Sequence, residues 1–283
     1  MPTIPVLANT VVPHGVNTVT EPVPSPFRLL AVSFLQANTL SQIGHGSIYA
    51  LLQVLRQGNP VYTAFAGYIM TGPTRSAPVI GYQMFPSSQC SFDCETGDIL
   101  SLTLWGGQES SGAVVEAVLV AGKAGEGPMD AVPFYEPPFT GPGAIVVFTN
   151  AQPAAGADYT AVTVPLFARW RLRGFYGSLT TSSTAGNRLV TLVKGEPAST
   201  APLNGDISAA NQAASETIAY YFGLGAQNQS GLATAAAIAV GLSDLTMWNA
   251  MTFVTKTGGL AAADQWSTGY YVVEEWVGPA PNA

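Results

Sequence analysis

The sequence predicts an all-β protein built from two tandem antiparallel β-sandwich domains, jelly-roll-like in architecture and related by an internal duplication. The first observation is composition: the 283 residues include 30 Gly and 21 Pro, and only 10% are charged, which favours turns and strands over long helices. The second is a series of short apolar or alternating segments separated by Gly, Pro, Asn or Ser. The third is a set of segments in the first half that recur, in the same order, in the second half of a chain longer than one typical domain.

The first domain is predicted to comprise residues 1 to 122. Prolines punctuate residues 1 to 25 and prevent a helix there, so we predict an extended N-terminal arm whose apolar residues could supply a first strand. Six strands are then predicted from apolar or alternating runs. They are Phe27–Gln36, Ser47–Arg56, Tyr62–Met70, Val79–Phe85, Ile99–Trp105 and Val114–Val120.

Residues 123 to 143 are predicted to link the two domains. The stretch from Gly122 to Gly143, GKAGEGPMDAVPFYEPPFTGPG, has Gly and Pro too densely spaced for a core element. Its aromatic residues Phe134, Tyr135 and Phe139 indicate that the linker packs against a neighbouring surface.

The second domain, residues 144 to 283, repeats four segments of the first. The pairs are Trp170-Arg171-Leu172 with Phe27-Arg28-Leu29, Gly186–Val193 with Gly46–Gln53, Met251–Gly259 with Leu100–Gly107, and Val272-Val273-Glu274 with Val114-Val115-Glu116. The largest insertion, Gly195–Ser215, is predicted to be a surface loop with one or two helical turns. Seven or eight strands in each domain favour a jelly roll over an immunoglobulin-type sandwich.

The charge balance and hydropathy argue against two classes of partner. A net charge of −7 and a pI near 4.7 provide no basic footprint for nucleic acid. No apolar run approaches the ~20 residues that span a bilayer, and the first 25 residues do not resemble a signal peptide. We therefore expect neither a nucleic-acid partner nor a membrane partner.

No catalytic motif is found, so we predict that the protein is not an enzyme and uses no cofactor or metal. Phosphate-binding and nucleophile motifs are absent. The two histidines, His14 and His45, have no metal-ligand spacing and are predicted to be loop residues. Glu274 and Glu275 are the closest pair of carboxylates, but neighbours on a strand face opposite sides, so a shared glycosidase-like site is not expected.

The two cysteines and a nearby group of three acidic residues are each assigned a structural role. Cys90 and Cys94 are too far apart in an extended strand for a disulfide and are predicted to be reduced structural thiols. Asp93, Glu95 and Asp98 form a D-x-E-x-x-D pattern that could offer oxygens to calcium, although a solvated turn is the preferred interpretation.

The most unusual charge feature is Arg169, Arg171 and Arg173. In a strand the three would share one face, while Trp170 and Leu172 face the core. The row is either a solvated outer face or a docking row for carboxylates of a partner subunit. A further aromatic set is interpreted as core more readily than as a sugar-stacking platform. It comprises Trp105, Trp248, Trp266 and Trp276.

Three stretches of the second half carry a resemblance to known proteins. WRLRGFYGSLTTSSTAGNRLVTLVKGE, the later GLGAQNQSG and the closing YYVVEEWVG are similar to a loosely defined group of β-sandwich virion proteins of tailed bacteriophages. The similarity is strongest over residues 165 to 278; the first domain lacks the A-G-N-R stretch and keeps one matching arginine, Arg28. The resemblance implies a head or tail protein and assigns no catalytic or binding residues.

We therefore expect a bacteriophage structural protein, located in the virion after assembly in the host cytoplasm. The preferred role is a capsid decoration or cement protein, commonly a homotrimer, that contacts the major capsid protein and stabilises the head shell. A largely uncharged surface suits a protein buried among neighbours. A double jelly-roll shell protein ranks second, because long loop insertions and some helix would be expected of one. A tail receptor-binding protein and a tandem carbohydrate-binding module rank below these two roles.

Overall fold

The structure is a computed structural model in which the chain is all-β and divides into two compact units. Unit 1 comprises Met1–Ala144 and Trp276–Ala283, and unit 2 comprises Ile145–Glu275. Strands β1 to β21 make up the secondary structure, and the described residues contain no α-helix. The described residues are 6–36, 47–70, 82–84, 91–108, 112–125, 134–135, 138–139, 141, 143–195, 202–208, 210–226 and 237–279.

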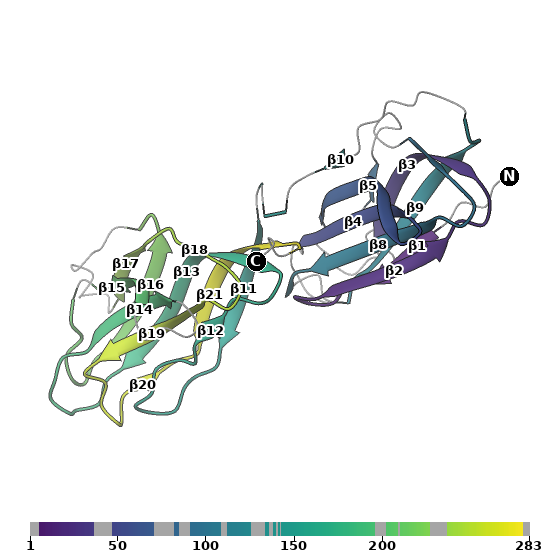
Figure 1. The fold of residues 1–283 in the computed structure, drawn as a ribbon. Coiled ribbons are helices and arrows are strands. Elements are labelled where there is room, and N and C mark those ends of the chain that lie inside the picture. The colour runs from purple at the N-terminus through teal and green to yellow at the C-terminus, as the bar shows by residue number, and fades with distance from the viewer. Residues whose placement is uncertain are drawn as a thin grey trace. The chain divides into compact units, whose positions relative to one another are not determined.

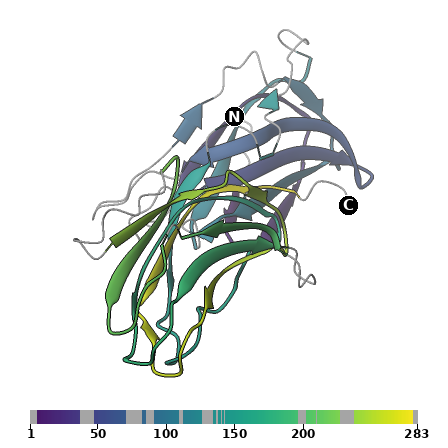
Figure 2. The same ribbon diagram turned by 90° about the vertical axis from the view of Figure 1, so that its left-hand side faces the viewer.

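Unit 1 consists of two sheets that face each other (Figures 1 and 2). One sheet has the strand order β1-β9-β3-β6, with β7 also paired to β3, and the other has the order β10-β5-β4-β8-β2. The strands are β1 (Val6–Thr10), β2 (Val16–Pro22), β3 (Phe27–Gln36), β4 (Ser47–Arg56), β5 (Asn59–Met70), β6 (Tyr82–Met84), β7 (Phe92–Cys94), β8 (Ile99–Gly106), β9 (Val114–Gly122) and β10 (Phe134–Tyr135).

The pairing in unit 1 is that of a jelly roll. When β7 and β10 are left aside, eight strands remain, and the first pairs with the eighth, the second with the seventh, the third with the sixth and the fourth with the fifth. Further pairs join the third strand to the eighth and the fourth to the seventh. All of these pairs are antiparallel, so the chain forms a ribbon of nested hairpins rolled into two facing sheets.

Unit 2 repeats this strand order. Its sheets have the orders β11-β21-β13-β16-β17, which we call sheet C, and β12-β19-β14-β15, which we call sheet D. The added strand β17 pairs parallel with β16, and β18 and β20 pair with β13. The strands are β11 (Ala144–Asn150), β12 (Val162–Thr163), β13 (Ala168–Thr180), β14 (Leu189–Gly195), β15 (Pro202–Ile207), β16 (Thr217–Leu224), β17 (Ala237–Leu242), β18 (Thr246–Met247), β19 (Thr252–Gly258), β20 (Gln265–Trp266) and β21 (Gly269–Val277).

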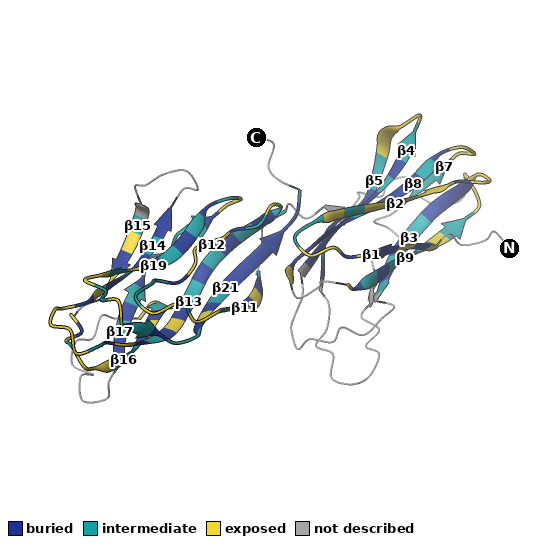
Figure 3. Ribbon diagram, turned by 90° about the horizontal axis from the view of Figure 1, so that it is seen from below, coloured by how far each residue is buried: buried dark blue, intermediate teal, exposed yellow. Residues whose placement is uncertain are grey.

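The core of each unit lies between its two sheets, because alternate residues of each strand turn inward (Figure 3). In unit 1 the rings of Phe34 on β3 and Phe65 on β5 meet across the sandwich with centroids 4.7 Å apart. In unit 2 the ring of Phe253 on β19 lies 4.8 Å from Tyr271 on β21 and 6.3 Å from Trp170 on β13. Within each unit, aromatic contacts thus join its two facing sheets.

The four segment pairs found in the sequence lie on strands at corresponding positions in the two units. They fall on β3 and β13, the third strands; β4 and β14, the fourth; β8 and β19, the seventh; and β9 and β21, the eighth. The recurring residues are therefore those that build the inner strands of each sandwich.

The predicted N-terminal arm is extended where the structure describes it, and it supplies two strands where one was expected. Residues 6–10 and 16–22 form β1 and β2, which pair along their full lengths with β9 and β8. Leu7 and Val11 are buried in the core of unit 1. The prolines do not prevent these strands, because Pro13 lies between them and Pro22 ends β2 at the sheet edge.

The prediction of a surface loop at 195–215 is also wrong. Within this segment residues 202–207 form β15, which pairs antiparallel with β14 and supplies the fifth strand of the jelly roll. No helical turn is present in the described part, and Asp206, Ser208 and Gln212 are buried. Their polarity suggested a loop, but each is hydrogen-bonded inside the unit.

The segment predicted as a linker, residues 123 to 143, falls within unit 1, and parts of it that the structure describes pack there. β10 adds a parallel pair to β5, and Phe139 is buried, with its backbone N–H donating to the Tyr68 hydroxyl at 2.7 Å. The indole N–H of Trp276, near the end of β21, donates to the Gly141 carbonyl at 2.9 Å.

Cys94 is a free thiol in the core of unit 1, as predicted, whereas Cys90 lies outside the described residues. Burial, assisted by the charge of Asp98, raises the pKa of the Cys94 thiol to about 12. Because the thiolate is the reactive species, iodoacetamide at pH 8 should leave Cys94 unmodified in the folded protein and alkylate it in denaturant. Peptide mass spectrometry checks this, and equal alkylation in both states would contradict it.

Candidate functional site

The arginine row, Arg169, Arg171 and Arg173, lies on the outer face of sheet C. Burial alternates along the first part of β13, with Trp170 and Leu172 buried and the three arginines half-buried. The predicted division of this strand into a core face and an arginine face is confirmed.

Two of the three arginines are held by carboxylates of the same unit. Arg171 forms a bidentate ion pair with Asp244, which follows β17. The Nη1 atom of Arg171 also lies 3.8 Å from Glu274 Oε2 on β21. Arg173 Nη2 lies 2.7 Å from the same Glu274 oxygen. The hydrogen bond between Arg171 and Asp244 raises the pKa of the guanidinium and lowers the pKa of the carboxyl. Arg171 and Arg173 are therefore each oriented by an ion pair within unit 2.

The third arginine, Arg169, packs over the ring of an exposed tryptophan, Trp248. The guanidinium carbon of Arg169 lies 4.9 Å from the ring centroid of Trp248, a cation–π contact. Trp248 follows β18 and is 42% exposed. An ordered, exposed tryptophan beside arginines is the composition found at the centres of protein interfaces.

Beyond Arg173 the alternation of β13 shifts by one residue. Even-numbered residues face inward up to Leu172, whereas Phe175 and Leu179 face inward after it, and both Arg173 and Gly174 are half-buried between them. The shift places Tyr176 on the same outer face as the arginine row.

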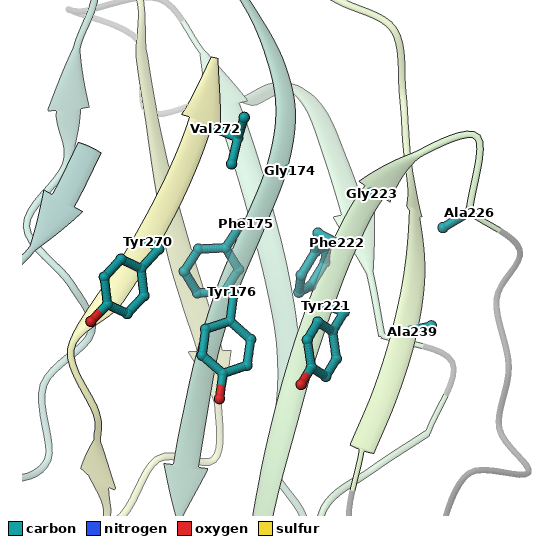
Figure 4. Close-up of a pocket in the computed structure, with 10 residues that line it drawn as sticks. All are labelled: Gly174, Phe175, Tyr176, Tyr221, Phe222, Gly223, Ala226, Ala239, Tyr270 and Val272. Carbon is teal, nitrogen blue, oxygen red and sulfur yellow. The ribbon is translucent and has the colours of Figure 1, made fainter. Parts of the chain in front are cut away.

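Tyr176 forms the middle of a row of three tyrosines on neighbouring strands. It is the direct cross-strand partner of Tyr221 on β16, with ring centroids 4.9 Å apart, and its ring lies 6.2 Å from that of Tyr270 on β21. Figure 4 shows the three side chains next to one another with their hydroxyls pointing the same way. All three rings are more than one-third exposed.

Small residues beside these rings leave a groove of about 290 Å³, which we call the tyrosine groove. Gly174 and Gly223 are cross-strand partners, so two adjacent strands lack a side chain at the same level. None of the lining residues is charged. They are Gly174, Phe175, Tyr176, Tyr221, Phe222, Gly223, Ala226, Ala239, Tyr270 and Val272 (Figure 4).

These three tyrosines were not predicted as a site from the sequence, although a signal was present. Two of them belong to the doublets Tyr220-Tyr221 and Tyr270-Tyr271. In a strand one member of each doublet must face outward, and Tyr220 and Tyr271 are the buried members. Tyr176 was not predictable, because the period of the arginine row places odd-numbered residues outward, whereas the alternation shifts after Arg173.

Glu274 and Glu275 face opposite sides of sheet C, as predicted. Glu274 meets the arginine row on the outer face, whereas Glu275 accepts a hydrogen bond from the Trp170 indole N–H at 2.8 Å inside the sandwich. Both carboxylates thus have structural partners on separate faces.

The other aromatic and histidine candidates are distributed as follows. Trp105, Trp266 and Trp276 are buried, as the core interpretation predicted, and Trp248 is exposed. His14 lies between β1 and β2 and His45 lies outside the described residues.

The predicted turn at Gly97 is present, but its carboxylates are paired with arginines, and Asp98 is buried and not solvated. Asp93 accepts two hydrogen bonds from Arg28, at 2.8 and 2.7 Å, and the Arg28 side chain is 2% exposed. The side chain of Asp98 is equally buried and accepts two hydrogen bonds from Arg56, both at 2.9 Å. Glu95 lies 2.9 Å from the Arg56 guanidinium. Paired arginines satisfy the carboxylates here.

These pairs predict acid sensitivity of unit 1. The hydrogen bonds from Arg56 hold the pKa of Asp98 below its ordinary value despite burial. A depressed folded-state pKa contributes stability above the unfolded value of about 3.9, and that stability is lost as pH falls through the folded-state pKa. Thermal unfolding from pH 7 to pH 2 should therefore show a steep acid loss in the native chain and a shallower one in Asp98→Asn, which should already be less stable at pH 7. Parallel curves would contradict the prediction.

Two further features are absent from the part of the chain that the structure describes. No group of three or more His, Cys, Asp or Glu side chains is placed to hold a metal ion. Nor is any helix there long and apolar enough to span a bilayer.

The chain is thus a tandem jelly-roll protein that carries a surface of aromatic and arginine side chains on its second unit. The chain matches no protein-family model, and no curated protein shows significant similarity to its sequence. Function must therefore be inferred from the architecture and the surface chemistry.

Proposed function

We propose that the chain is a structural protein of a bacteriophage virion, acting as a decoration protein that binds and stabilises the head shell. The observation that carries the proposal is the arginine row with Trp248, an ordered surface rich in the residue types that dominate binding energy. Jelly rolls are common in viral capsid proteins, as they are in lectins and cupins. The internal duplication is part of the proposal, since both units share one strand order.

The charge on this surface favours an acidic partner. Three of the ten basic residues of a chain whose net charge is −7 lie together on this surface, where Arg171 pairs with Asp244 and Arg173 with Glu274. A partner carboxylate that meets it would be steered by charge and held by the aromatic ring. Acidic patches of the major capsid protein or of a second subunit have the required chemistry.

Copurification with intact virions tests the role. We expect the chain to be present on purified heads together with a separate shell protein, and its absence from virions would refute the proposal. Trp248→Ala should leave unit 2 folded and weaken binding to heads that lack the protein by about tenfold or more, as expected when an interface anchor is removed. Lys256→Glu on sheet D is a control, because Lys256 is exposed on the other sheet.

One observation favours a second candidate, a double jelly-roll shell protein. Two complete jelly rolls follow each other in the chain. If heads contain this chain at every shell position and no other shell protein, the shell role replaces decoration.

A further inference from the structure

We propose that the tyrosine groove of unit 2 binds an uncharged carbohydrate. The site is distinct from the arginine row and does not depend on the virion role. It is carried by three observations: a row of exposed tyrosine rings, a hollow made by paired glycines, and a set of uncharged hydroxyls on the same face.

The three rings offer a stacking surface. Tyr221, Tyr176 and Tyr270 are 47%, 38% and 42% exposed although they lie next to one another across three central strands. Cross-strand aromatic pairs stabilise a sheet, yet these rings leave much of their apolar surface in water. The C–H face of a pyranose ring packs against aromatic rings in the same way as other apolar groups.

The hollow beside the rings is built into the backbone. Gly174 and Gly223 have no positive φ, so no turn requires glycine there. A Cβ atom added at Gly174 would lie 3.4 Å from the Phe222 carbonyl oxygen and 3.9 Å from Val272 Cβ, which are ordinary contacts. The backbone would therefore accept a larger residue, and the consequence of having glycine at both positions is the open groove.

Neutral hydroxyl groups continue the outer face beyond the rings, toward the end of β13, whereas the ion-paired Arg173 and Glu274 adjoin the opposite end of the groove. Outward positions on β13 after Tyr176 are Ser178 and Thr180, and Thr217 on β16 lies opposite Thr180 with the two hydroxyl oxygens 3.0 Å apart. The tyrosine hydroxyls in Figure 4 point toward this end of β13. Hydroxyls both donate and accept hydrogen bonds, as sugar hydroxyls do. No charged residue lines the groove, so a charged sugar or nucleotide is disfavoured.

The volume of the groove limits how many sugar rings it can hold. Its 290 Å³ lies just below the range of about 300 to 1,000 Å³ typical of sites for drug-sized molecules. One or two sugar rings would therefore occupy it, as part of a longer glycan that continues along the sheet face.

Affinity electrophoresis of the full chain in native gels tests the proposal. The probes are four neutral polysaccharides: dextran, laminarin, galactomannan and arabinogalactan. We expect at least one to retard the protein, with an affinity reduced about tenfold or more in Tyr176→Ala through loss of a stacking anchor. Gly174→Val should reduce binding similarly, because it fills the hollow and keeps all three rings. Tyr176→Phe, which keeps the ring, should retain most of the affinity.

Two controls separate this proposal from the virion role and from self-association. Trp248→Ala should bind polysaccharide normally while losing binding to heads, so the two proposals fail independently. Sedimentation velocity without polysaccharide shows whether the groove holds a second copy of the chain. Absence of retardation by all four polysaccharides, retardation unchanged in Tyr176→Ala and Gly174→Val, or self-association abolished by Tyr176→Ala would each overturn the proposal.

Discussion

Asp264→Asn should destabilise unit 2 by about 3 to 5 kcal/mol, the cost of leaving a buried charge without its partner. The side chains of Asp264 and Arg188 are both fully buried, with Arg188 Nε 2.7 Å and Nη2 3.0 Å from the carboxylate oxygens. The same carboxylate accepts hydrogen bonds from the Ser182 N–H and hydroxyl and from the Ala261 N–H. Burial works to raise the pKa of Asp264, but these hydrogen bonds outweigh it and hold the pKa far below its ordinary value.

The effect should be large because Asp264 joins two loops. Arg188 also donates to the carbonyls of Thr184 and Gly186, so the carboxylate fixes the whole turn between β13 and β14. Calorimetry of the native chain and the variant gives the change in the unfolding transition of unit 2. Asp244→Asn is the matched control: it removes the same charge from an exposed pair and should cost much less. Equal losses in the two variants would contradict the prediction.

Trp170→Ala should also destabilise unit 2 by about 3 to 5 kcal/mol, the usual cost of removing a large buried aromatic side chain. Trp170 is 2% exposed and packs against the rings of Phe148 and Phe253. Its loss opens a cavity between sheets C and D. It also removes the indole N–H that donates to the buried Glu275 carboxylate, and a weakened hydrogen bond to a buried charge adds to the cost.

Two further variants separate the cavity from the hydrogen bond. Trp170→Phe fills part of the space but removes the donor, so it should recover only part of the stability. Combining it with Glu275→Gln removes the buried charge and should recover more. Trp248→Ala, at an exposed tryptophan, should change the free energy of unfolding by no more than about 0.5 kcal/mol. A loss at Trp170→Ala as small as that at Trp248→Ala would show that the core repacks.

Much of the fold was predictable because strand formation is locally encoded. The bounds of β3 and β4 match the predicted segments, since each is an apolar run ended by polar or turn-forming residues. β2 and β15 were missed for a common reason. They lie at sheet edges or next to edges and contain many polar residues, so their pairing depends on distant strands.

The candidate site was predictable only in part. Alternation placed the arginine row outward and Trp170 inward, because the side-chain period of a strand is a property of the backbone. The partners of that row were not predictable: Asp244 and Glu274 lie 73 and about 100 residues from Arg171 in the chain. The position of the tyrosine groove depends on the shift in alternation along β13 and on the register between β13 and β16.

Three features of this protein can be recognised without its structure: it is all-β, similar segments recur in its two halves, and β13 has a core face and an arginine face. These features depend on composition and on a period of two, which act over a few residues. Three other features become visible only in the folded chain. They are the pairing of the strands, the ion pairs of Arg28 and Arg56 with acidic residues near Gly97, and the shared surface of three tyrosines that are distant in sequence. The physical reason is register: a shift of one residue, as in β13, exchanges the two faces of a strand.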